Sequence, residues 1–157
     1  HILPLSSFLK DCSLPKGFYP EKKIFSSFQK YILDSAEVGI NLLNTISRFD
    51  VGQSAVVSSK LVYAIEGQEG TDCMIDRAGS LSNKNNLITH PGPVLIKIPK
   101  INQNINLDPP VVGFETVRKC IENNFSSLVV SSNGTIIFEL KKIMNLIKTK
   151  NFVIYVV

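Results

Sequence analysis

The first third of the chain carries apolar residues at helical spacing. They recur in three- and four-residue steps at Phe25, Phe28, Ile32, Val38, Leu42, Leu43 and Ile46. This periodicity predicts helical structure over residues 21–48. Asp34 or Ser35 could restart the helix as an N-cap, so one long helix and two consecutive helices both fit the pattern.

Short β-branched runs indicate strands in the rest of the chain. SAVVSSKLVYAIEG (54–67) predicts a hairpin that turns at SSK, and PVLIKIPK (93–100) predicts a strand with one lysine on its alternate face. SSLVVSS (126–132) predicts a buried strand, and FVIYVV (152–157) predicts a closing strand. NGTIIFE (133–139) predicts a turn followed by a strand.

Helical patterns alternate with these strands. Residues 72–80 predict a short helix capped by Thr71 or Asp72. FETVRKCIENN (114–124) predicts a second helix and LKKIMNLIKTKN (140–151) an amphipathic third. The alternation of strands and helices favours an α/β layer.

Two segments are predicted to lack regular structure. LSNKNNLITHPG (81–92) is polar throughout, and INQNINLDPPVVG (101–113) contains two adjacent prolines, which regular structure does not accommodate. The whole pattern predicts an α/β fold in which a mixed sheet with some parallel pairing is flanked by helices. We expect residues 21–157 to form this single domain.

Residues 1–20 predict a linker that runs over a surface, because Pro4, Pro15, Gly17 and Pro20 interrupt any regular pattern there. The sequence has no initiator Met and begins in the middle of a pattern. We therefore expect the chain to be a fragment whose N-terminal part is missing.

Composition narrows the class of protein. Hydrophobic residues make up 44% of the 157 residues and charged residues 19%, which is typical of a globular chain. The net charge of +4 comes from scattered lysines and arginines, so it fits an anionic ligand, an anionic membrane face or an ordinary solvated surface. Without a basic stripe or paired aromatics on a strand, a nucleic-acid partner is not expected.

Cysteine and histidine usage excludes several chemistries. Cys12, Cys73 and Cys120 are far apart and form no CxxC motif, which favours reduced thiols in a cytosolic protein. Only two histidines are present, so His-dependent nucleophilic catalysis and zinc binding have little support. What remains for chemistry is carboxylates, amides and lysines around glycine turns.

One such cluster is EGQEGTDCMIDRAG (66–79). Gly70 allows the backbone to approach a ligand closely. Thr71 and Asp72 begin a helix whose unpaired N–H groups favour anions, although plain N-capping explains the same residues. We interpret Glu66 and Asp76 as structural or solvated, with Arg77 as a partner.

A second cluster surrounds the end of the PVLIKIPK strand. Lys97 and Lys100 flank this end, and Gln103 and Asp108 follow on the irregular segment. Loops at strand ends carry the ligand contacts of α/β proteins. Two lysines there could hold phosphates while Asp108 binds a metal or activates water, but a surface loop is the competing interpretation. Gly52 and Gln53 form either a turn with one amide contact or only a turn.

In combination these stretches carry a resemblance. DVGQSAVV (50–57), EGQEGTDCMIDRAG (66–79) and VLIKIPKINQNINLDPPVVGFETV (94–117), in this order, resemble the C-terminal domain of the UDP-2,3-diacylglucosamine pyrophosphatase family of lipid A biosynthesis. This is the alphaproteobacterial type, unrelated to the calcineurin-like phosphoesterases. The similarity runs from about Gly17 to the end of the chain, and the combination of EGTD with the downstream KxxKxxQxxxxDxP is fairly specific.

The resemblance implies a hydrolase that converts UDP-2,3-diacylglucosamine and water into UMP and 2,3-diacylglucosamine 1-phosphate with Mg²⁺ or a similar divalent ion. It implies that Asp108 is the catalytic residue, as metal ligand or water-positioning base, with Asp72 as the second metal candidate. The other implied substrate contacts are Gly52, Gln53, Gly70, Thr71, Asp72, Lys97, Lys100 and Gln103.

The sequence also departs from the family pattern, which commonly reads KPGQDxRxDxP. Asn104 stands where an acid is usual and Asn106 where an arginine is usual, and Ile101 and Asn102 replace Pro-Gly. These departures motivate an alternative, a non-catalytic lipid- or nucleotide-binding module of the same fold. A purely structural interaction domain, with no phosphate ligand, is the third hypothesis.

The expected partners follow from the resemblance. The resemblance implies that this domain is the C-terminal half of a longer, two-domain protein. The expected partners are therefore a lipid-nucleotide substrate and the preceding N-terminal domain, with a homodimer left open. The cysteine usage favours the cytoplasm as the location. Because the implied substrate is amphiphilic, transient peripheral contact at the inner membrane is an additional hypothesis.

Overall fold

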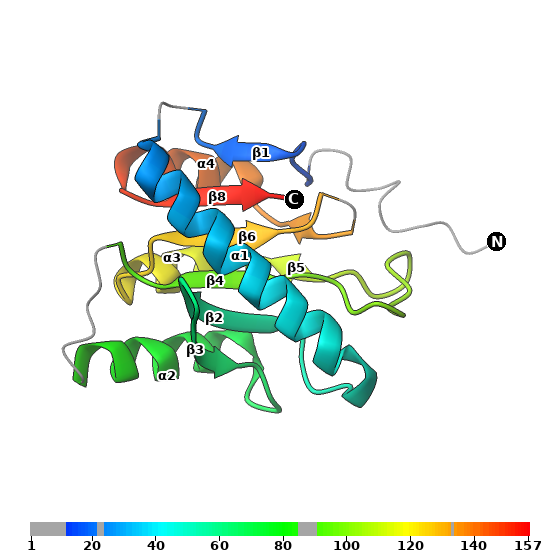
Figure 1. Ribbon diagram of the computed structural model, residues 1–157. Helices are drawn as coiled ribbons and strands as arrows, with labels where there is room; N and C mark the ends of the chain where they lie inside the picture. The colour runs from blue at the N-terminus through cyan, green and yellow to red at the C-terminus, as the bar shows by residue number, and fades with distance from the viewer. Residues whose placement is uncertain (1–11, 22–23, 85–90, 133) are drawn as a thin grey trace.

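The computed structural model describes residues 12–21, 24–84, 91–132 and 134–157. These residues form a mixed six-stranded sheet in the order β1-β8-β6-β4-β2-β3 and a second sheet of two strands, β5 and β7 (Figure 1). The strands of the large sheet are β1 (Gly17–Tyr19), β2 (Ser54–Ser58), β3 (Leu61–Ile65), β4 (Val94–Lys97), β6 (Ser127–Val130) and β8 (Val153–Val156). The small sheet consists of β5 (Val111–Val112) and β7 (Ile136–Ile137).

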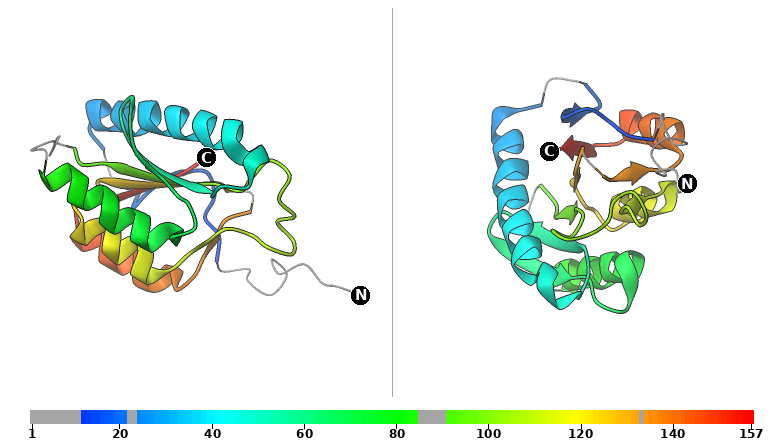
Figure 2. Two further views of the ribbon diagram at one scale, coloured as in Figure 1. Left: turned by 90° about the horizontal axis from the view of Figure 1, so that it is seen from below. Right: turned by 90° about the vertical axis from the view of Figure 1, so that its right-hand side faces the viewer.

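Helices cover both faces of the large sheet, as Figure 2 shows. One face carries α1 (Ser26–Ile46) alone, which a short 3₁₀ turn, η2 (Ser47–Phe49), extends. The other face carries α2 (Gly70–Lys84), α3 (Phe114–Glu122) and α4 (Leu140–Thr149). The predicted α/β fold with a mixed sheet and flanking helices is therefore confirmed.

The sheet has a parallel centre with antiparallel flanks. Strands β4, β6 and β8 run parallel, while β2 pairs antiparallel with β4 and β3 antiparallel with β2. The helices α3 and α4 supply the crossovers that parallel strands require. This topology places the carboxyl ends of β4 and β6, the start of β2 and the end of β3 on the same edge of the sheet.

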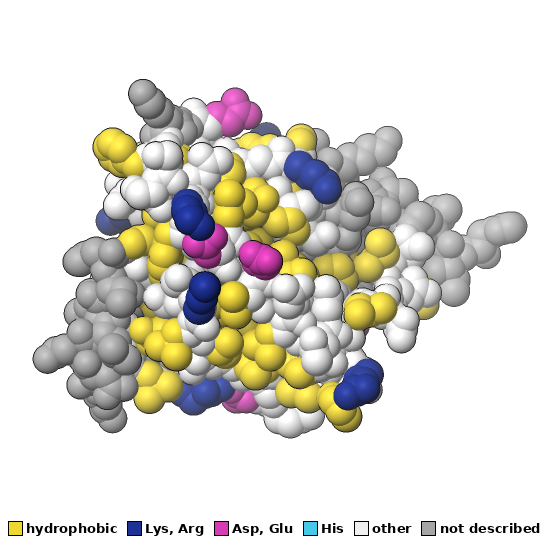
Figure 3. Space-filling model, in the orientation of Figure 1, with side chains coloured by type: hydrophobic (Ala, Val, Ile, Leu, Met, Phe, Trp, Pro, Cys, Tyr) yellow, Lys and Arg dark blue, Asp and Glu magenta, His cyan; other side chains and the backbone are white. Residues whose placement is uncertain are grey.

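Two hydrophobic layers follow from strand alternation. Val94 and Ile96 of β4 are buried against the α1 layer, whereas Leu95 is buried in the layer with α2, α3 and α4. Gly39 lets α1 approach the sheet closely, because a Cβ at this position would lie 2.7 Å from Ile96 Cγ1. Figure 3 shows that the outer surface over α1 is largely uncharged, with a small group of charged side chains.

The predicted linker over residues 1–20 is wrong at its C-terminal end. Gly17–Tyr19 forms β1, which pairs antiparallel with β8 from Gly17↔Val156 to Tyr19↔Ile154. The strand covers the open edge of β8, whose backbone groups would otherwise lack partners. Three residues between prolines give no detectable strand pattern in the sequence. Residues 1–11 lie outside the described structure, and the preceding domain stays a prediction.

The alternative of two helices is also wrong, because α1 runs without a break through Asp34 and Ser35. Ser35 does not cap a new helix. Its hydroxyl donates to the carbonyl oxygen of Tyr31 at 2.8 Å and accepts from the N–H of Ser59 at 2.8 Å. A serine that bonds back to the preceding turn is compatible with a helix interior.

Both segments predicted as irregular contain regular structure. The helix α2 begins at Gly70 and continues to Lys84, so it includes the start of segment 81–92, while residues 85–90 lie outside the described structure. Val111 and Val112 form β5, parallel to β7. Pro109 and Pro110 precede this strand, so they remove no backbone N–H donor from it.

Within the described ranges, none of the helices combines the length and the apolar character needed to cross a lipid bilayer.

Candidate functional site

The candidate site lies at the edge where the parallel strands end. Lys97 is the last residue of β4, and Ser54, the first residue of β2, is its register partner. Glu66 directly follows β3, and α2 and α3 both begin at this edge, which lies to the right in Figure 1. Ligand sites of open α/β sheets form outside the carboxyl ends of the strands, so the topology supports this placement.

A buried polar network occupies the centre of this edge. Lys97 Nζ donates a hydrogen bond to Thr71 Oγ1 at 2.6 Å, and Thr71 Oγ1 donates to Glu66 Oε1 at 2.6 Å. Glu66 Oε2 accepts from the backbone N–H of Gln53 at 3.1 Å. Lys97 is 6% exposed and Glu66 8% exposed, so a charge of each sign lies inside the protein.

Burial and the nearby opposite charges shift the pKa of each of these two groups in opposite directions. Burial lowers the pKa of the Lys97 ammonium below its usual range, and the negative charges of Glu66 and Asp72 offset only part of this effect. Burial alone would raise the pKa of the Glu66 carboxyl. The hydrogen bond from Thr71, the charge of Lys97 and the N–H of Gln53 outweigh it, so this pKa is lowered.

Two glycines bring the backbone close around the network. A Cβ at Gly52 would lie 2.4 Å from the carbonyl oxygen of Glu66, so only glycine allows this approach. Gly70 begins α2 with a φ of +77°, a left-handed conformation that favours glycine. Thr71 and Asp72 therefore lie inside the helix. Their side chains bond to other elements, so the predicted capping role of these residues is wrong.

A hollow of about 260 Å³ opens beside the network. Its lining residues are Val51, Gly52, Gln53, Glu66, Gly67, Gln68, Gly70 and Lys100. Gln53 Oε1 is buried and has no hydrogen bond partner among the described residues. The structure thus brings the predicted residues Gly52, Gln53, Gly70 and Lys100 together around one concave surface.

Lys100 also lines a neighbouring hollow of about 250 Å³, together with Ser47, Asp50, Asn102, Gln103 and Asp108. Its ammonium forms a hydrogen-bonded ion pair with Asp50 at the end of η2. The hydrogen bond from Lys100, followed by its charge, lowers the pKa of the Asp50 carboxyl. Lys100 therefore connects the hollow beside Glu66 with the hollow that contains Asp108.

The loop that carries Asp108 is held by its own amides. Gln103 Oε1 accepts from the backbone N–H of Lys100 at 2.9 Å, and Gln103 Nε2 donates to the carbonyl oxygen of Asp108 at 2.6 Å. Asn104 Oδ1 accepts from the N–H of Asn106 at 3.2 Å. The amide of Gln103, predicted to contact substrate, is used inside the loop in this structure.

The two carboxylates predicted as metal ligands lie in different networks. Asp108 is exposed beside Gln103, whereas Asp72 Oδ1 accepts a hydrogen bond from Thr116 Oγ1 at 3.0 Å. Throughout the described ranges, no three His, Cys, Asp or Glu residues form a group that could hold a metal ion. Mg²⁺ commonly uses one or two carboxylates together with substrate phosphates. The hollow with Asp108 and Asp50 fits that arrangement, in which the ligand completes the metal site.

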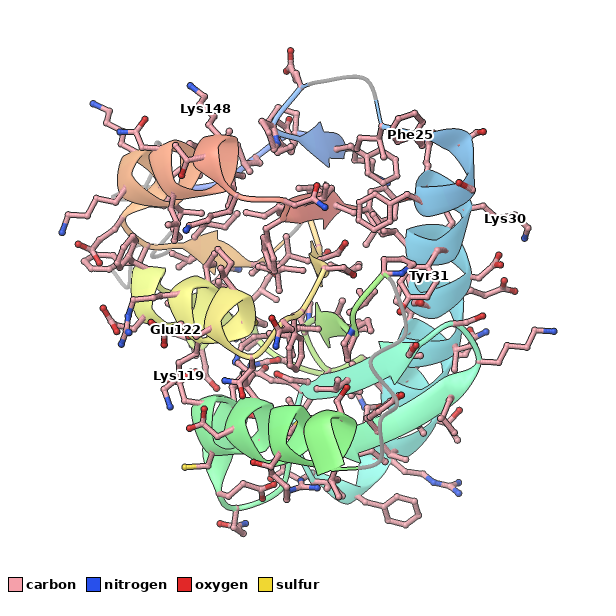
Figure 4. All side chains as sticks on the ribbon, turned by 90° about the vertical axis from the view of Figure 1, so that its left-hand side faces the viewer. Phe25, Lys30, Tyr31, Lys119, Glu122 and Lys148 are labelled. Carbon is pink, nitrogen blue, oxygen red and sulfur yellow. The ribbon has the colours of Figure 1, made fainter. Side chains whose placement is uncertain are left out.

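The structure corrects the sequence interpretation of the remaining acids of segment 66–79. Glu69, not Asp76, pairs with Arg77, at 2.5 Å. Asp76 Oδ2 instead accepts from Lys119 of α3, a residue that Figure 4 labels at the α2–α3 interface. Glu66, interpreted as structural or solvated, is a buried member of the site. Strand alternation puts Glu66 on the same face as Ala64, two residues earlier, but only the structure shows that this face is buried.

A hollow of about 450 Å³ lies at the opposite edge of the sheet, beside Phe25, which directly precedes α1 (Figure 4). Its described lining is Phe25, Phe28, Pro91, Gly92, Ile121, Asn124, Phe125, Ser126, Lys150, Asn151 and Phe152. No carboxylate is among these residues. This hollow therefore offers no carboxylate for the predicted hydrolytic chemistry, whereas the hollow beside Lys100 contains Asp50 and Asp108.

Comparison with known proteins shows the family to which the chain belongs. The family model of the LpxI C-terminal domain matches residues 22–155. The chain belongs to this LpxI family. A curated relative, the UDP-2,3-diacylglucosamine pyrophosphatase LpxI of Caulobacter vibrioides, is 30% identical over 107 residues.

That match covers 67% of this chain and 38% of the relative. The chain thus spans well under half of the length of the LpxI relative. The LpxI family match includes every element of the candidate site, from η2 and β2 through α2 and β4 to the loop with Asp108.

Proposed function

We propose that the full-length protein hydrolyses the pyrophosphate bond of UDP-2,3-diacylglucosamine in lipid A biosynthesis. Water oxygen forms a new bond to phosphorus, the bridging P–O bond breaks, and the products are UMP and 2,3-diacylglucosamine 1-phosphate. The observation that carries this proposal is the match to the LpxI C-terminal domain over residues 22–155, which contain two lysines and an exposed aspartate at one sheet edge.

The residues at this edge have complementary roles in the proposal. Lys100 lies between the two hollows, so its ammonium can neutralise phosphate charge in either. Asp108 is the exposed carboxylate of the second hollow and would bind a divalent ion or orient the attacking water. A bound divalent ion would polarise the phosphoryl oxygens and lower the pKa of water. We keep Asp72 as the second candidate ligand.

A second candidate function is a non-catalytic module that binds a lipid or a nucleotide. The observation that favours it is Asn104, which occupies the place of a family acid and is used in a turn with Asn106. The turn therefore forms without the charged pair that the family commonly has at these two positions.

We also propose that the preceding N-terminal domain completes the substrate site and that the protein works in the cytoplasm with transient contact at the inner membrane. Exposed apolar side chains surround the site edge, among them Phe49, Ile101 and Leu107, at 64%, 64% and 60% exposure. They support contact with an amphiphile. Flotation with anionic vesicles at low salt tests the membrane contact, and a protein that stays at the bottom of the gradient contradicts it.

The proposed reaction is tested by incubating the full-length protein with UDP-2,3-diacylglucosamine and Mg²⁺. We expect UMP and 2,3-diacylglucosamine 1-phosphate to accumulate in equal amounts. A flat time course together with measurable ligand binding would instead support the non-catalytic module.

A further inference from the structure

The ammonium of Lys97 is incompletely paired. An ammonium has three N–H donors and no acceptor. One of them goes to Thr71 Oγ1 at 2.6 Å, and the other two have no partner among the residues that the structure describes. Because the side chain is 6% exposed, bulk water does not replace the missing partners freely. Buried charges are normally paired and hydrogen-bonded, so this arrangement indicates a group that a ligand completes.

Counting hydrogens at Thr71 fixes the direction of each bond. Lys97 can only donate, so Thr71 Oγ1 accepts from it and must send its own hydrogen elsewhere. Glu66 Oε1 lies 2.6 Å away and is an acceptor, whereas Ser54 Oγ is more distant at 3.4 Å. The hydroxyl of Thr71 therefore has no hydrogen left for a phosphate oxygen.

Glu66 is itself held firmly in place. Its second carboxylate oxygen accepts from the N–H of Gln53 at 3.1 Å, and its own N–H donates to the carbonyl oxygen of Ser54 at 2.9 Å. The carboxylate is thereby fixed against β2, and it fixes the hydroxyl that receives Lys97. The proposed hydrolysis gives Glu66 no role of its own.

We propose that Glu66 is a positioning residue that, through the hydroxyl of Thr71, aims the two remaining N–H groups of Lys97 at a phosphate group of the ligand. This inference deepens the proposed function and rests on it for the source of the phosphate. It gives Thr71 the role of an acceptor for Lys97, in place of a phosphate donor.

The proposal and simple electrostatics predict opposite effects of the Glu66→Gln substitution on anion binding. A carboxylate beside an anion site repels the anion, so removal of its charge should strengthen anion binding if Glu66 is only a neighbour. If Glu66 positions Lys97, the Glu66→Gln substitution should weaken binding. In addition, Glu66→Gln should have no further effect once Lys97 is absent, because residues that act as one unit are not additive.

Titration calorimetry of the full-length protein with UMP and with inorganic pyrophosphate, in EDTA, tests this. We expect Glu66→Gln and Lys97→Met each to weaken binding by at least about tenfold, since hydrogen bonds to charged groups contribute strongly. The double variant should bind as Lys97→Met does. Thr71→Val should also lose affinity, and Thr71→Ser should retain it. Asp34→Asn, on the exposed face of α1, is the matched control, and circular dichroism verifies that each variant folds.

Unchanged or tighter binding by folded Glu66→Gln would overturn the proposal, as would additive losses in the double variant. If Glu66→Gln does not fold, equal affinities of Thr71→Val and Thr71→Ser would overturn it. An absence of anion binding by the wild-type protein would overturn it too, even if turnover is intact. Binding that follows the expected pattern without turnover would retain this inference and reject the proposed hydrolysis.

Discussion

The carboxylate of Glu66 and the ammonium of Lys97 lie on either side of one hydroxyl, that of Thr71, which is 2.6 Å from each. The three residues come from the end of β3, the first turn of α2 and the end of β4. The network therefore ties three elements together at the edge of the sheet where Lys100 and Asp108 also lie.

The lowered pKa of Glu66 predicts how stability depends on pH. Burial works against ionisation of Glu66, but its hydrogen bonds and Lys97 make the net shift downward. A carboxyl whose pKa is lower in the folded than in the unfolded state contributes stability above its unfolded pKa of about 4.3. That contribution is lost as the pH falls through the folded pKa. Between about pH 7 and about pH 3, the free energy of unfolding measured with urea should therefore fall less in Glu66→Gln than in the wild type.

The same measurement has an internal control in Glu37→Gln, an exposed glutamate on α1. This variant should follow the wild-type pH dependence. If Glu66→Gln and the wild-type protein lose the same free energy of unfolding over this range, the carboxylate of Glu66 does not carry the stabilising interactions described here.

Gly39 should resist substitution because of its contact with the sheet. A Cβ there would lie 2.7 Å from Cγ1 and 2.8 Å from Cδ1 of Ile96, which is fully buried. Overpacking a core typically costs about 1–3 kcal/mol. This exceeds the gain of about 1 kcal/mol in helix propensity from Gly to Ala. Thermal unfolding should show a lower midpoint for Gly39→Ala.

Asn41→Ala, at an exposed position of the same helix, provides the comparison for helix propensity alone, and its midpoint should not fall. A Gly39→Ala protein that is as stable as Asn41→Ala would show that α1 can move away from β4 without cost.

Asn104 offers a test of the loop that carries Asp108. An aspartate at 104 keeps the oxygen that accepts from the N–H of Asn106, so the turn should persist. It also adds a carboxylate to a loop in which the N–H of Asp108 already bonds to the carbonyl oxygen of residue 104 at 2.9 Å. Asn104→Asp should lower the Mg²⁺ concentration that gives half-maximal turnover, because Mg²⁺ prefers carboxylate oxygens. Asn41→Asp is the control, and an unchanged Mg²⁺ requirement would separate residue 104 from metal binding.

Periodicity and turn chemistry predicted most of this fold. The hairpin of β2 and β3, the buried strand β6 and the amphipathic helix α4 follow from local patterns and are confirmed. The strands β1 and β5 could not be predicted in this way. Each has only two or three residues, and each is stabilised by a partner distant in sequence, β8 and β7 respectively. Pairing of this kind is a tertiary interaction, which a local pattern does not encode.

Glu66 illustrates the same limit for the site. Next to a glycine turn, an acid resembles a solvated loop residue. Its importance arises only when β2, β3 and β4 align and bury it with Lys97. The sequence could indicate Lys97, Lys100 and Asp108, because they surround the end of one strand. It could not indicate which buried carboxylate stands opposite Lys97.

The role of Asp108 in the proposed hydrolysis is tested most directly by UMP release from UDP-2,3-diacylglucosamine with Mg²⁺. The full-length protein is compared with its Asp108→Ala variant, and Asp34→Ala on α1 is the control. We expect turnover by the wild type and the control and a loss of at least about a hundredfold in Asp108→Ala, equivalent to about 2.7 kcal/mol of barrier. Turnover that survives in a folded Asp108→Ala protein would contradict the role of Asp108 and transfer the metal or water-positioning function to another acid, with Asp72 the next to substitute.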